Sequence, residues 1–558
     1  MSEFSLYLGM TPAMRQALEN PFYYLENFRQ VLAWVSRHHS DLLDETELAF
    51  IERFALLPQP SQALLVRMVM RKGMLFRASK LRYPEIGCSR RALEPLIDQG
   101  WVDASSALTL EQLFALLTKG ELLQVFGSSA SASLRKAELL DKLRADHQMA
   151  KPFQAWCSQI EDAVFALCID ELCERLRLLF FGNIHQDWSE FVLADLGIYR
   201  YEQVVFSPSS RAFNCRAELD AYLHLHRCRE RFDTGEPLSD VLADVPDESY
   251  ANAWLESRRG KLLLSIGQQF ERIGDLPEAL RLHASNSYPG ARERAIRVLE
   301  RCGQPAAALE LLDQAQAASQ SEHELQQLQR IKPRLQRSLG IPALRSLNRK
   351  PEQLDLILPR AGCSVEHAVR EHLSIPDAPV YYVENALVGS LFGLLCWDAI
   401  FAPLPGAFFH PFHWAPADLN RADFHQRRAD LFAACLACLD SDDYRDCIWR
   451  TFQAKLGIHN AFVAWGLLDE ELLTHALTCI PAAHLKLMFQ RILADVCGNR
   501  TGLPDLIQLW PEERRYRMIE VKGPGDRLQD NQKRWIDYAH QHGLPIAVCH
   551  VQWAEVMA

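Results

Sequence analysis

The feature that most constrains the fold is the pattern of the last sixty residues, which contain GLPDLIQLW (502–510) and YRMIEVKG (516–523). Two apolar runs, 506–510 and 516–521, predict a β-hairpin. Side chains alternate along a strand, so Glu520 and Lys522 share one face and Val521 lies on the other. The hairpin would bring Asp505, at the start of the first strand, near Glu520.

The segment after this hairpin predicts a helix and a further strand. Asp526 is a candidate N-cap for the helix LQDNQKRWIDYAHQHG, and PIAVCHVQ follows as a strand. Gln532 is polar on an otherwise apolar helix stripe, close to the strand end that bears Lys522. Strand, strand, helix, strand, with acids at the strand ends, indicates an α/β core like that of restriction endonucleases.

The acids in this core indicate metal-dependent chemistry. Two carboxylates side by side in a low-dielectric cleft repel each other, and one or two Mg²⁺ or Mn²⁺ ions would relieve that repulsion. Such an ion polarises a phosphodiester and acidifies a bound water. Lys522 would position the water or stabilise charge on the phosphate. We therefore expect a nuclease with Asp505, Glu520, Lys522 and Gln532 as catalytic candidates.

The rest of the chain is too long for one hydrophobic core. At 558 residues we expect three or four domains, and 48% apolar residues exclude a largely disordered chain. No run of uncharged apolar residues is long enough to span a membrane, so no membrane association is expected. The fifteen scattered cysteines suggest reduced thiols in the cytoplasm. The net charge of -11 still permits a local phosphate-binding patch.

Such a patch occurs at residues 67–91, where eight Lys or Arg accompany one acid. Residues 22–57 predict an amphipathic helix, 62–82 continue helical, and another helix starts near Ser89 as a possible cap. The arrangement favours a helix-turn-helix or winged module, although a solvated helix face would look similar. The candidate DNA-binding residues are Arg71, Lys72, Arg77, Lys80, Arg82, Arg90 and Arg91.

Two helical segments follow the basic patch, at 109–127 and 133–145, joined by small residues. Arg135 and Lys136 open the second helix and are further DNA-binding candidates. The pattern resembles a SAP module, a helix-linker-helix unit that grips duplex DNA. An ordinary helical hairpin is the alternative.

Residues 254–338 repeat themselves with a 29-residue offset, because ERIGDLPEALRL at 271–282 matches ERCGQPAAALEL at 300–311. Glycine between helices and alanine where they pack predict a helical array similar to tetratricopeptide repeats. Residues 341–360 contain several prolines and predict a linker. YLHLHRC (222–228), CxxC at Cys435 and Cys438, and HPFH (410–413) are expected to be structural rather than metal sites.

A family resemblance becomes specific in the C-terminal residues. PD at 504–505 followed by EVK at 520–522 fits the PD-(D/E)xK nuclease signature. The longer run GLPDL…EVKGPGDRL…Q..W…VCHV resembles the VRR-NUC domain, and within it the Fanconi-associated nuclease family. The resemblance extends to VENALVGSLFGLLCWDAIF (383–401) and FHQRR (424–428). It implies that Glu384, on a helix, joins Asp505, Glu520 and the Val521 carbonyl as metal ligands, with Lys522 catalytic.

The resemblance also implies a layout and a substrate. The expected fold is multidomain and mainly α: a helical and winged-helix DNA-binding region (1–105), a SAP-like module (106–148), a helical connector (149–250), TPR-like repeats (251–345) and an α/β nuclease domain (360–558) with its core at about 480–553. Family members cut 5′ flaps, digest DNA 5′ to 3′ from ends or nicks, and act in interstrand cross-link repair. Branched double-stranded DNA is therefore the expected partner, with Arg427 and Arg428 also near it.

Departures from the family pattern narrow these expectations. The Cys/His spacing of a ubiquitin-binding zinc finger is missing, so ubiquitin binding is not expected, and a bacterial protein at the nucleoid is favoured. Arg500 precedes GLPD and is a further DNA-binding candidate, but Cys497 stands where some relatives carry an arginine for a 5′ phosphate. Selection by a terminal phosphate would then be weaker. The alternatives are a Holliday-junction resolvase and a non-catalytic DNA-repair scaffold; protein partners stay unassigned.

Overall fold

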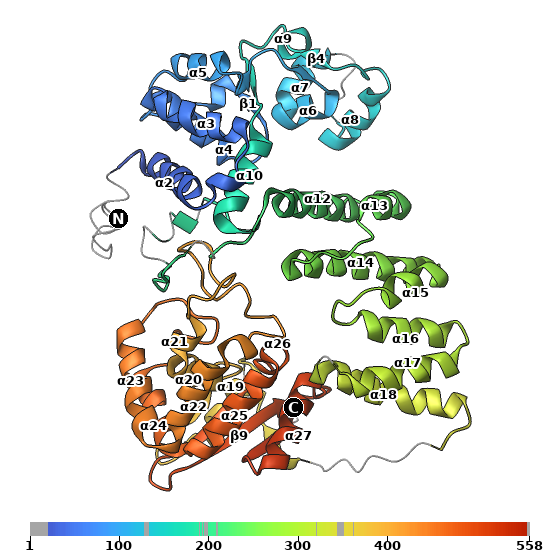
Figure 1. Ribbon diagram of the computed structural model, residues 1–558, viewed down its shortest axis with the longest axis vertical. Coiled ribbons are helices and arrows are strands. Elements are labelled where there is room, and N and C mark those ends of the chain that lie inside the picture. Colours follow the sequence, from blue (N-terminus) through green and yellow to red (C-terminus); the bar gives the residue numbers. More distant parts are fainter. Residues whose placement is uncertain are drawn as a thin grey trace. The chain divides into compact units, whose positions relative to one another are not determined.

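The computed structural model describes residues 20–127, 133–188, 190–191, 194, 199–207, 210–319, 321–342, 351–360 and 362–554 (Figure 1). The chain divides into two compact units, residues 1–200 with 211–219 and residues 201–210 with 220–558. Helices dominate both units, as predicted. The two units are described in turn.

The first unit begins with helices around a small sheet. α2 (Tyr23–His38) ends before α3 (Glu45–Leu56), which starts at a capping box formed by Asp44 and Glu47. The prediction of one continuous helix over 22–57 is therefore wrong, because Asp44 accepts the Glu47 amide and starts a new helix. The remaining elements are η3 (Ser40–Leu42), α4 (Gln59–Val69), β1 (Leu75–Arg77), η4 (Ala78–Lys80), α5 (Ser89–Asp98), β2 (Val102–Asp103), β5 (Val164–Leu167) and α10 (Asp170–Phe181).

A three-stranded antiparallel sheet in the order β1-β5-β2 ties the first unit together. β5 lies in the segment expected to be a helical connector from residue 149, and that expectation is wrong for this part. The helix predicted over 62–82 likewise gives way to β1. The N-cap of α5 is Cys88, and Ser89 instead bonds the Leu81 carbonyl through its hydroxyl.

The SAP-like part contains α6 (Leu110–Leu116), α7 (Lys119–Phe126) and α8 (Lys136–Arg144). Its first predicted helix is two helices, because Thr118 forms a capping box with Glu121 and starts α7. Most of the predicted linker lies outside the described residues. β3 (Ala107–Leu108) pairs with β4 (Lys151–Pro152), and α9 (Phe153–Trp156) closes the core over Leu113, Leu122 and Leu139.

The second unit opens with stacked helices that include the predicted repeat (Figure 1). α14 (Ala253–Ile273) ends at Gly274 and α16 (Ala291–Arg301) ends just before Gly303, with φ of +90° and +71°. Glycine adopts this left-handed conformation without strain. Ala279 and Ala308 are fully buried in the partner helices, as the repeat predicted. The other helices are α12 (Arg216–Asp233), α13 (Leu238–Asp244), α15 (Leu276–Ala284), α17 (Pro305–Ala317) and α18 (Glu322–Ser338).

The nuclease sheet has five strands in the order β6-β10-β9-β8-β7. β10 runs parallel to both β6 and β9, whereas β8 is antiparallel to β9 and β7. The predicted strand, strand, helix, strand order is confirmed by β8 (Leu506–Trp510), β9 (Arg515–Lys522), α27 (Asp530–His542) and β10 (Ile546–Trp553).

Four elements of this sheet domain differ from the prediction in presence or position. β6 (Glu352–Leu358) lies within the segment predicted to be a linker, and it starts the nuclease domain before residue 360. α19 (Val365–Leu373) and β7 (Val380–Tyr382) then precede a long helical insertion. α27 begins at Asp530, while Asp526 accepts the Gly523 amide at 3.0 Å and closes a turn rather than capping the helix.

The insertion between β7 and β8 forms the main hydrophobic core of the nuclease domain. α20 is buried along its whole length, with Phe392 packed against Phe432, Phe462 and Phe489. The elements of the insertion are α20 (Leu387–Leu395), α21 (Trp397–Ile400), η6 (Gln426–Arg428), α22 (Ala429–Ala437), η7 (Cys438–Asp440), α23 (Asp443–Lys455), α24 (Glu470–Cys479), α25 (Ala482–Ala494) and α26 (Val496–Asn499). Among the described helices, none can span a bilayer alone; α24 and α25 pass the length and composition criteria only as a pair bent by 106°.

Candidate active site

Asp505 stands immediately before β8 and is held from both sides by backbone hydrogen bonds. Its Oδ2 accepts the Val521 amide at 2.8 Å, and its carbonyl accepts the Val383 amide at 2.8 Å. These donors belong to β9 and to the segment that follows β7. The register of the sheet therefore sets the position of Asp505, whose side chain is mostly buried.

Glu520 and Lys522 lie on the same face of β9, as strand alternation predicts. Lys522 Nζ is 2.7 Å from Glu520 Oε1, and Glu520 is only 1% exposed. The intervening Val521 donates its amide to Asp505, so a single strand end gathers both acids and the ammonium group. The role of the Val521 carbonyl as a metal ligand stays a prediction.

The two acids are held where ionisation is unfavourable. Burial raises the pKa of Asp505, with a contribution from the charges of Glu384 and Glu366. Burial, and then the charge of Asp505, raises the pKa of Glu520 to about 7. A divalent cation with hard oxygen ligands would offset this excess of negative charge, so the residues fit such an ion.

Glu384 lies in the turn before α20, exposed, and not on the helix where it was expected. Its carboxylate accepts the Tyr382 hydroxyl. The neighbouring Asn385 has φ of +53° and accepts the Leu503 amide at 3.0 Å, which fastens this turn to the segment leading to Asp505. The charge of Glu384 contributes to the raised pKa of Glu520.

The sequence interpretation missed Glu366, which lies in the first turn of α19. Its charge contributes to the raised pKa of Asp505. An acid in a first helical turn is ordinary because it complements the helix dipole, so no pattern distinguished it. Within the described residues, no three His, Cys, Asp or Glu side chains are grouped closely enough to form a ready metal site.

Gln532 lies in the first turn of α27, where its side-chain oxygen accepts the Gln529 amide at 2.8 Å. This capping box satisfies an end group of the helix. Nothing in these contacts tests a catalytic role, which stays a prediction.

The predicted DNA-binding residues fall into two groups. Arg71, Lys72, Lys80, Arg82, Arg90, Arg91 and Arg135 are exposed, and Lys136 and Arg500 are half-buried. Arg77 is 8% exposed and pairs with Asp162 and Glu121, and Arg428 is 1% exposed and pairs with Asp418. Arg427 binds Asp418 as well. These ion pairs brace the protein interior, so Arg77 and Arg428 are unsuited to contact DNA.

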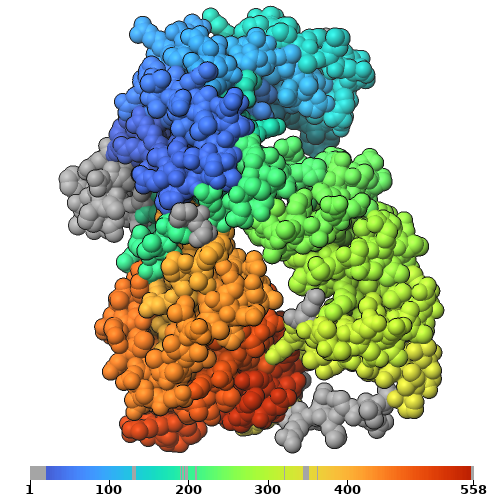
Figure 2. Space-filling view, viewed as in Figure 1, coloured from blue at the N-terminus to red at the C-terminus, as the bar shows by residue number. Residues whose placement is uncertain are grey.

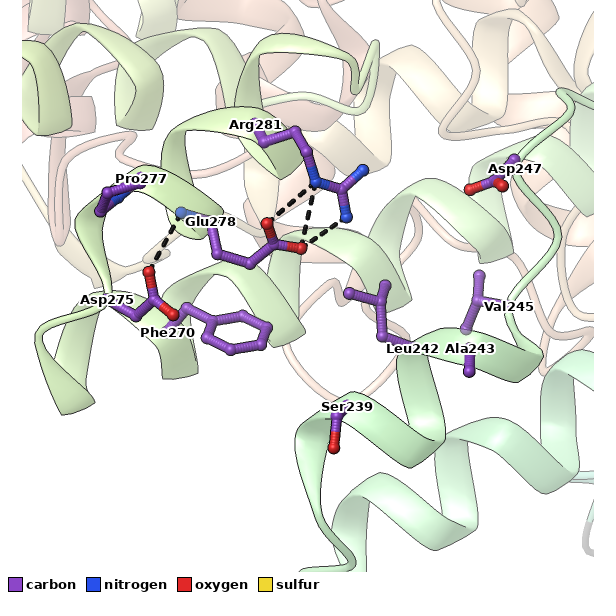
Figure 3. Close-up of a pocket in the computed structure, with 10 residues that line it drawn as sticks. All are labelled: Ser239, Leu242, Ala243, Val245, Asp247, Phe270, Asp275, Pro277, Glu278 and Arg281. Carbon is purple, nitrogen blue, oxygen red and sulfur yellow. Dashed lines mark hydrogen bonds and ion pairs between the residues drawn. The ribbon is translucent and has the colours of Figure 1, made fainter.

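A pocket of about 630 Å³ opens among α13, α14 and α15 (Figure 3). The acids Asp247, Asp275 and Glu278 line it with a single arginine, Arg281. Glu278 pairs with Arg281 at 2.5 Å, and Asp275 caps α15. An acidic rim repels phosphates, so this part of the repeats is a poor surface for DNA.

Comparison with known proteins places the chain in a family. Domain models match three segments: FAN1 HTH at 22–103, Fanconi anemia-associated nuclease SAP at 107–156 and VRR-NUC at 440–553. A Fanconi-associated nuclease 1 homolog of Pseudomonas aeruginosa is 56% identical over 98% of this chain and 99% of its own length. The chain belongs to the Fanconi-associated nuclease family. It is accordingly a structure-selective DNA nuclease, a phosphodiester hydrolase that depends on divalent metal.

Other family members show how far the similarity reaches. A homolog from Arabidopsis thaliana is 25% identical over 96% of this chain and 67% of its own length. The crystal structure of paFAN1 bound to 5′-flap DNA with a two-nucleotide flap and a gap is 56% identical, with a TM-score of 0.93. It covers 96% of this chain and 99% of that one. Both the first unit and the second are therefore family features.

Proposed function

We propose that this nuclease cuts 5′ flaps and digests DNA 5′ to 3′, with Asp505, Glu520 and Lys522 as catalytic residues. The observation that carries the proposal is the buried pair of acids beside the Lys522 ammonium group at the end of β9. Similarity over nearly the whole chain to a protein crystallised on 5′-flap DNA supports the substrate class. Repair of damaged DNA, including interstrand cross-links, follows from family membership.

The metal would be Mg²⁺ or Mn²⁺, as one or two ions held by Asp505, Glu520, Glu384 and the Val521 carbonyl. Such an ion, when bound, would polarise the phosphate to be cut and lower the pKa of a water molecule, so that hydroxide is available to attack the phosphorus. Lys522 then orients that water or stabilises the negative charge that grows on the phosphate oxygens. Its link to Glu520 keeps the ammonium group at the strand end in either role.

The accessible basic residues would hold the duplex. They are the exposed Arg71, Lys72, Lys80, Arg82, Arg90, Arg91 and Arg135 and the half-buried Lys136 and Arg500; the buried Arg77 and Arg428 are omitted, as is Arg427, which pairs with Asp418. We assign DNA binding to the segments 1–105 and 106–148, bracing to the repeats at 251–345, and cutting to residues from 352 onward. The protein would work at the bacterial nucleoid.

Cleavage of defined branched DNA tests this function. Purified protein is incubated in Mn²⁺ with end-labelled 5′-flap, 3′-flap and four-way junction DNA, beside Asp505→Ala. Glu513→Ala is the matched control, because Glu513 lies on the same hairpin, is exposed and pairs with Arg515. We expect the wild type and the control to cut the 5′ flap and Asp505→Ala to be inactive.

Three other outcomes point elsewhere. A wild type that binds DNA but cuts none of the substrates would favour a scaffold. Preferential cutting of the junction would favour a resolvase. Equal cutting by Asp505→Ala would remove Asp505 from the site.

A further inference from the structure

Side chains of the last repeat helix, α18, bind Asp530, the first residue of α27. Arg330 binds both carboxylate oxygens of Asp530, which follows it by 200 residues. Gln327 donates to the same carboxylate at 3.1 Å, and Gln326 donates to the Asp530 carbonyl at 3.2 Å. Figure 2 shows the yellow-green end of the repeats against the red C-terminal segment. Donors on one face of α18 therefore converge on a single acid.

Further polar contacts make this interface specific. Arg534 of α27 donates to Gln326 at 2.8 Å. Arg491 of α25, with a side chain only 5% exposed, pairs with Glu322 at the start of α18 at 2.8 Å. A charged side chain that binds several partners at once fixes the relative orientation of the helices, because few other arrangements satisfy all its hydrogen bonds. The repeats are thus attached to the nuclease domain in one register.

The first turn of α27 in turn packs on the segment that leads to the metal-site acids. Gly502 has φ of +88°, and a Cβ there would lie 2.7 Å from the Asn531 carbonyl carbon. Asn531 also reaches Thr501 Oγ1 at 3.4 Å. The backbone of residues 501–502 therefore rests directly on α27, and any shift of that turn moves the segment ahead of Asp505.

The same segment is fastened to the turn that carries Glu384. The Leu503 amide donates to Asn385 Oδ1 at 3.0 Å, next to Glu384 in sequence. The Asp505 carbonyl accepts the Val383 amide at 2.8 Å, on the other side of Glu384. One short segment, 501–505, thus joins α27 to two of the three candidate metal-binding acids, Glu384 and Asp505.

We propose that Asp530 is a positioning residue through which the repeat array sets the geometry of the metal-binding acids. The proposal rests on the proposed nuclease function and extends it to the repeats. Asp530 is the first residue of a helix, where the backbone alone already favours an acid. The convergence of Arg330 and Gln327 adds a restraint on where that helix begins. Loss of this restraint loosens the packing of α27 against residues 501–502, which precede Asp505, and changes no residue of the metal site.

A double-mutant cycle tests the link. Arg330→Gln, Asp530→Asn and the double variant are compared for kcat and KM on flap DNA, for Mn²⁺ affinity by calorimetry, and for amide exchange of Leu503. Arg334→Gln is the matched control, because Arg334 lies one turn along α18 and pairs with Glu300 within the repeats. Melting temperatures show whether each variant is folded.

We expect each single variant to lower kcat and weaken Mn²⁺ binding by about fivefold, with KM unchanged and faster exchange at Leu503. The double variant should be no worse than the worse single one, and Arg334→Gln should behave as wild type. Unchanged Mn²⁺ affinity in folded variants, additive losses, or an equal effect of Arg334→Gln would overturn the proposal. A wild type that binds Mn²⁺ but does not cut would overturn only the nuclease function, since metal affinity still reports the link.

Discussion

Replacing Glu520 with glutamine should stabilise the metal-free nuclease domain while removing its activity. Glutamine has nearly the same shape as a protonated glutamic acid, so the variant mimics a Glu520 that never ionises. Burial, followed by the charge of Asp505, raises the pKa of Glu520 from 4.5 to about 7. Ionisation of Glu520 therefore destabilises the folded wild-type protein, whereas glutamine carries no charge and avoids this cost.

The size and the pH dependence of the effect follow from that pKa. Each tenfold change in a protonation equilibrium corresponds to about 1.4 kcal/mol, so the raised pKa costs about 3 kcal/mol once the group is fully ionised. Because the pKa of this carboxyl is higher in the folded state than in the unfolded state, its ionisation lowers the free energy of unfolding. The cost is absent below pH 4.5, grows between pH 4.5 and about 7, and is complete above that. At pH 5 it is below about 1 kcal/mol.

Calorimetric melting of metal-free protein at pH 5 and pH 8 measures this difference. For a domain of this size about 1 kcal/mol shifts the melting temperature by about 2–4 °C, so Glu520→Gln should melt about 6–12 °C higher than wild type at pH 8. The gain should be small at pH 5. Mn²⁺ should stabilise the wild type at pH 8 and so reduce the difference in melting temperature between Glu520→Gln and wild type.

The matched control is Glu513→Gln, which changes an exposed acid on the same hairpin and should leave both melting curves almost unchanged, because its exposed ion pair with Arg515 contributes little to stability. An equal gain for Glu520→Gln at both pH values would refute the reasoning, because packing rather than ionisation would then be responsible. A variant less stable than wild type at pH 8 would show that the Lys522 pairing outweighs the burial of the charge.

Three further changes have outcomes set by local contacts. Asp505→Asn should lower the cleavage rate by about a thousandfold or more while DNA affinity in Ca²⁺ stays within about twofold, measured by single-turnover kinetics and fluorescence anisotropy; retained cleavage would contradict the metal-ligand role. Arg77→Met should destabilise the first unit by about 3–5 kcal/mol in urea unfolding, because the Asp162 carboxylate loses its cation and keeps only hydrogen bonds from Ser79 and Ala163; a loss of DNA affinity without destabilisation would restore Arg77 as a DNA contact. Gly502→Ala should reduce cleavage by about tenfold or more, because a Cβ at φ of +88° meets the Asn531 backbone; normal activity would show that segment 501–505 tolerates a shift.

Local pattern was sufficient to predict strand β9 and the repeat. Alternation along 516–522 put Glu520 and Lys522 on one face, and the observed 2.7 Å contact confirms it. The 29-residue period identified Gly274 and Gly303, which lie at equivalent ends of helices. Both signals depend on residues close in sequence, whose relation is fixed by strand or helix geometry.

Features that depend on distant pairing were missed or misplaced. β6 looked like a linker because its proline-rich surroundings hide a strand whose pairing partner is β10, nearly 200 residues later. Arg77 and Arg428 looked like DNA contacts because they stand among other basic residues, and only their partners Asp162 and Asp418 show that they brace the interior. Charge in a sequence does not reveal whether a partner acid lies beside it.

The sequence by itself determined the candidate residues and the family: the acids and lysine of the last sixty residues, their spacing, and the family they indicate. Only the tertiary structure decided how those groups are held. It shows Asp505 bonded to the Val521 amide, Glu384 in a turn rather than on a helix, Glu366 close enough to shift a pKa, and α18 gripping Asp530. Strand alternation acts over a few residues, whereas these contacts join segments up to 200 residues apart that meet only when the sheet and the repeats have packed.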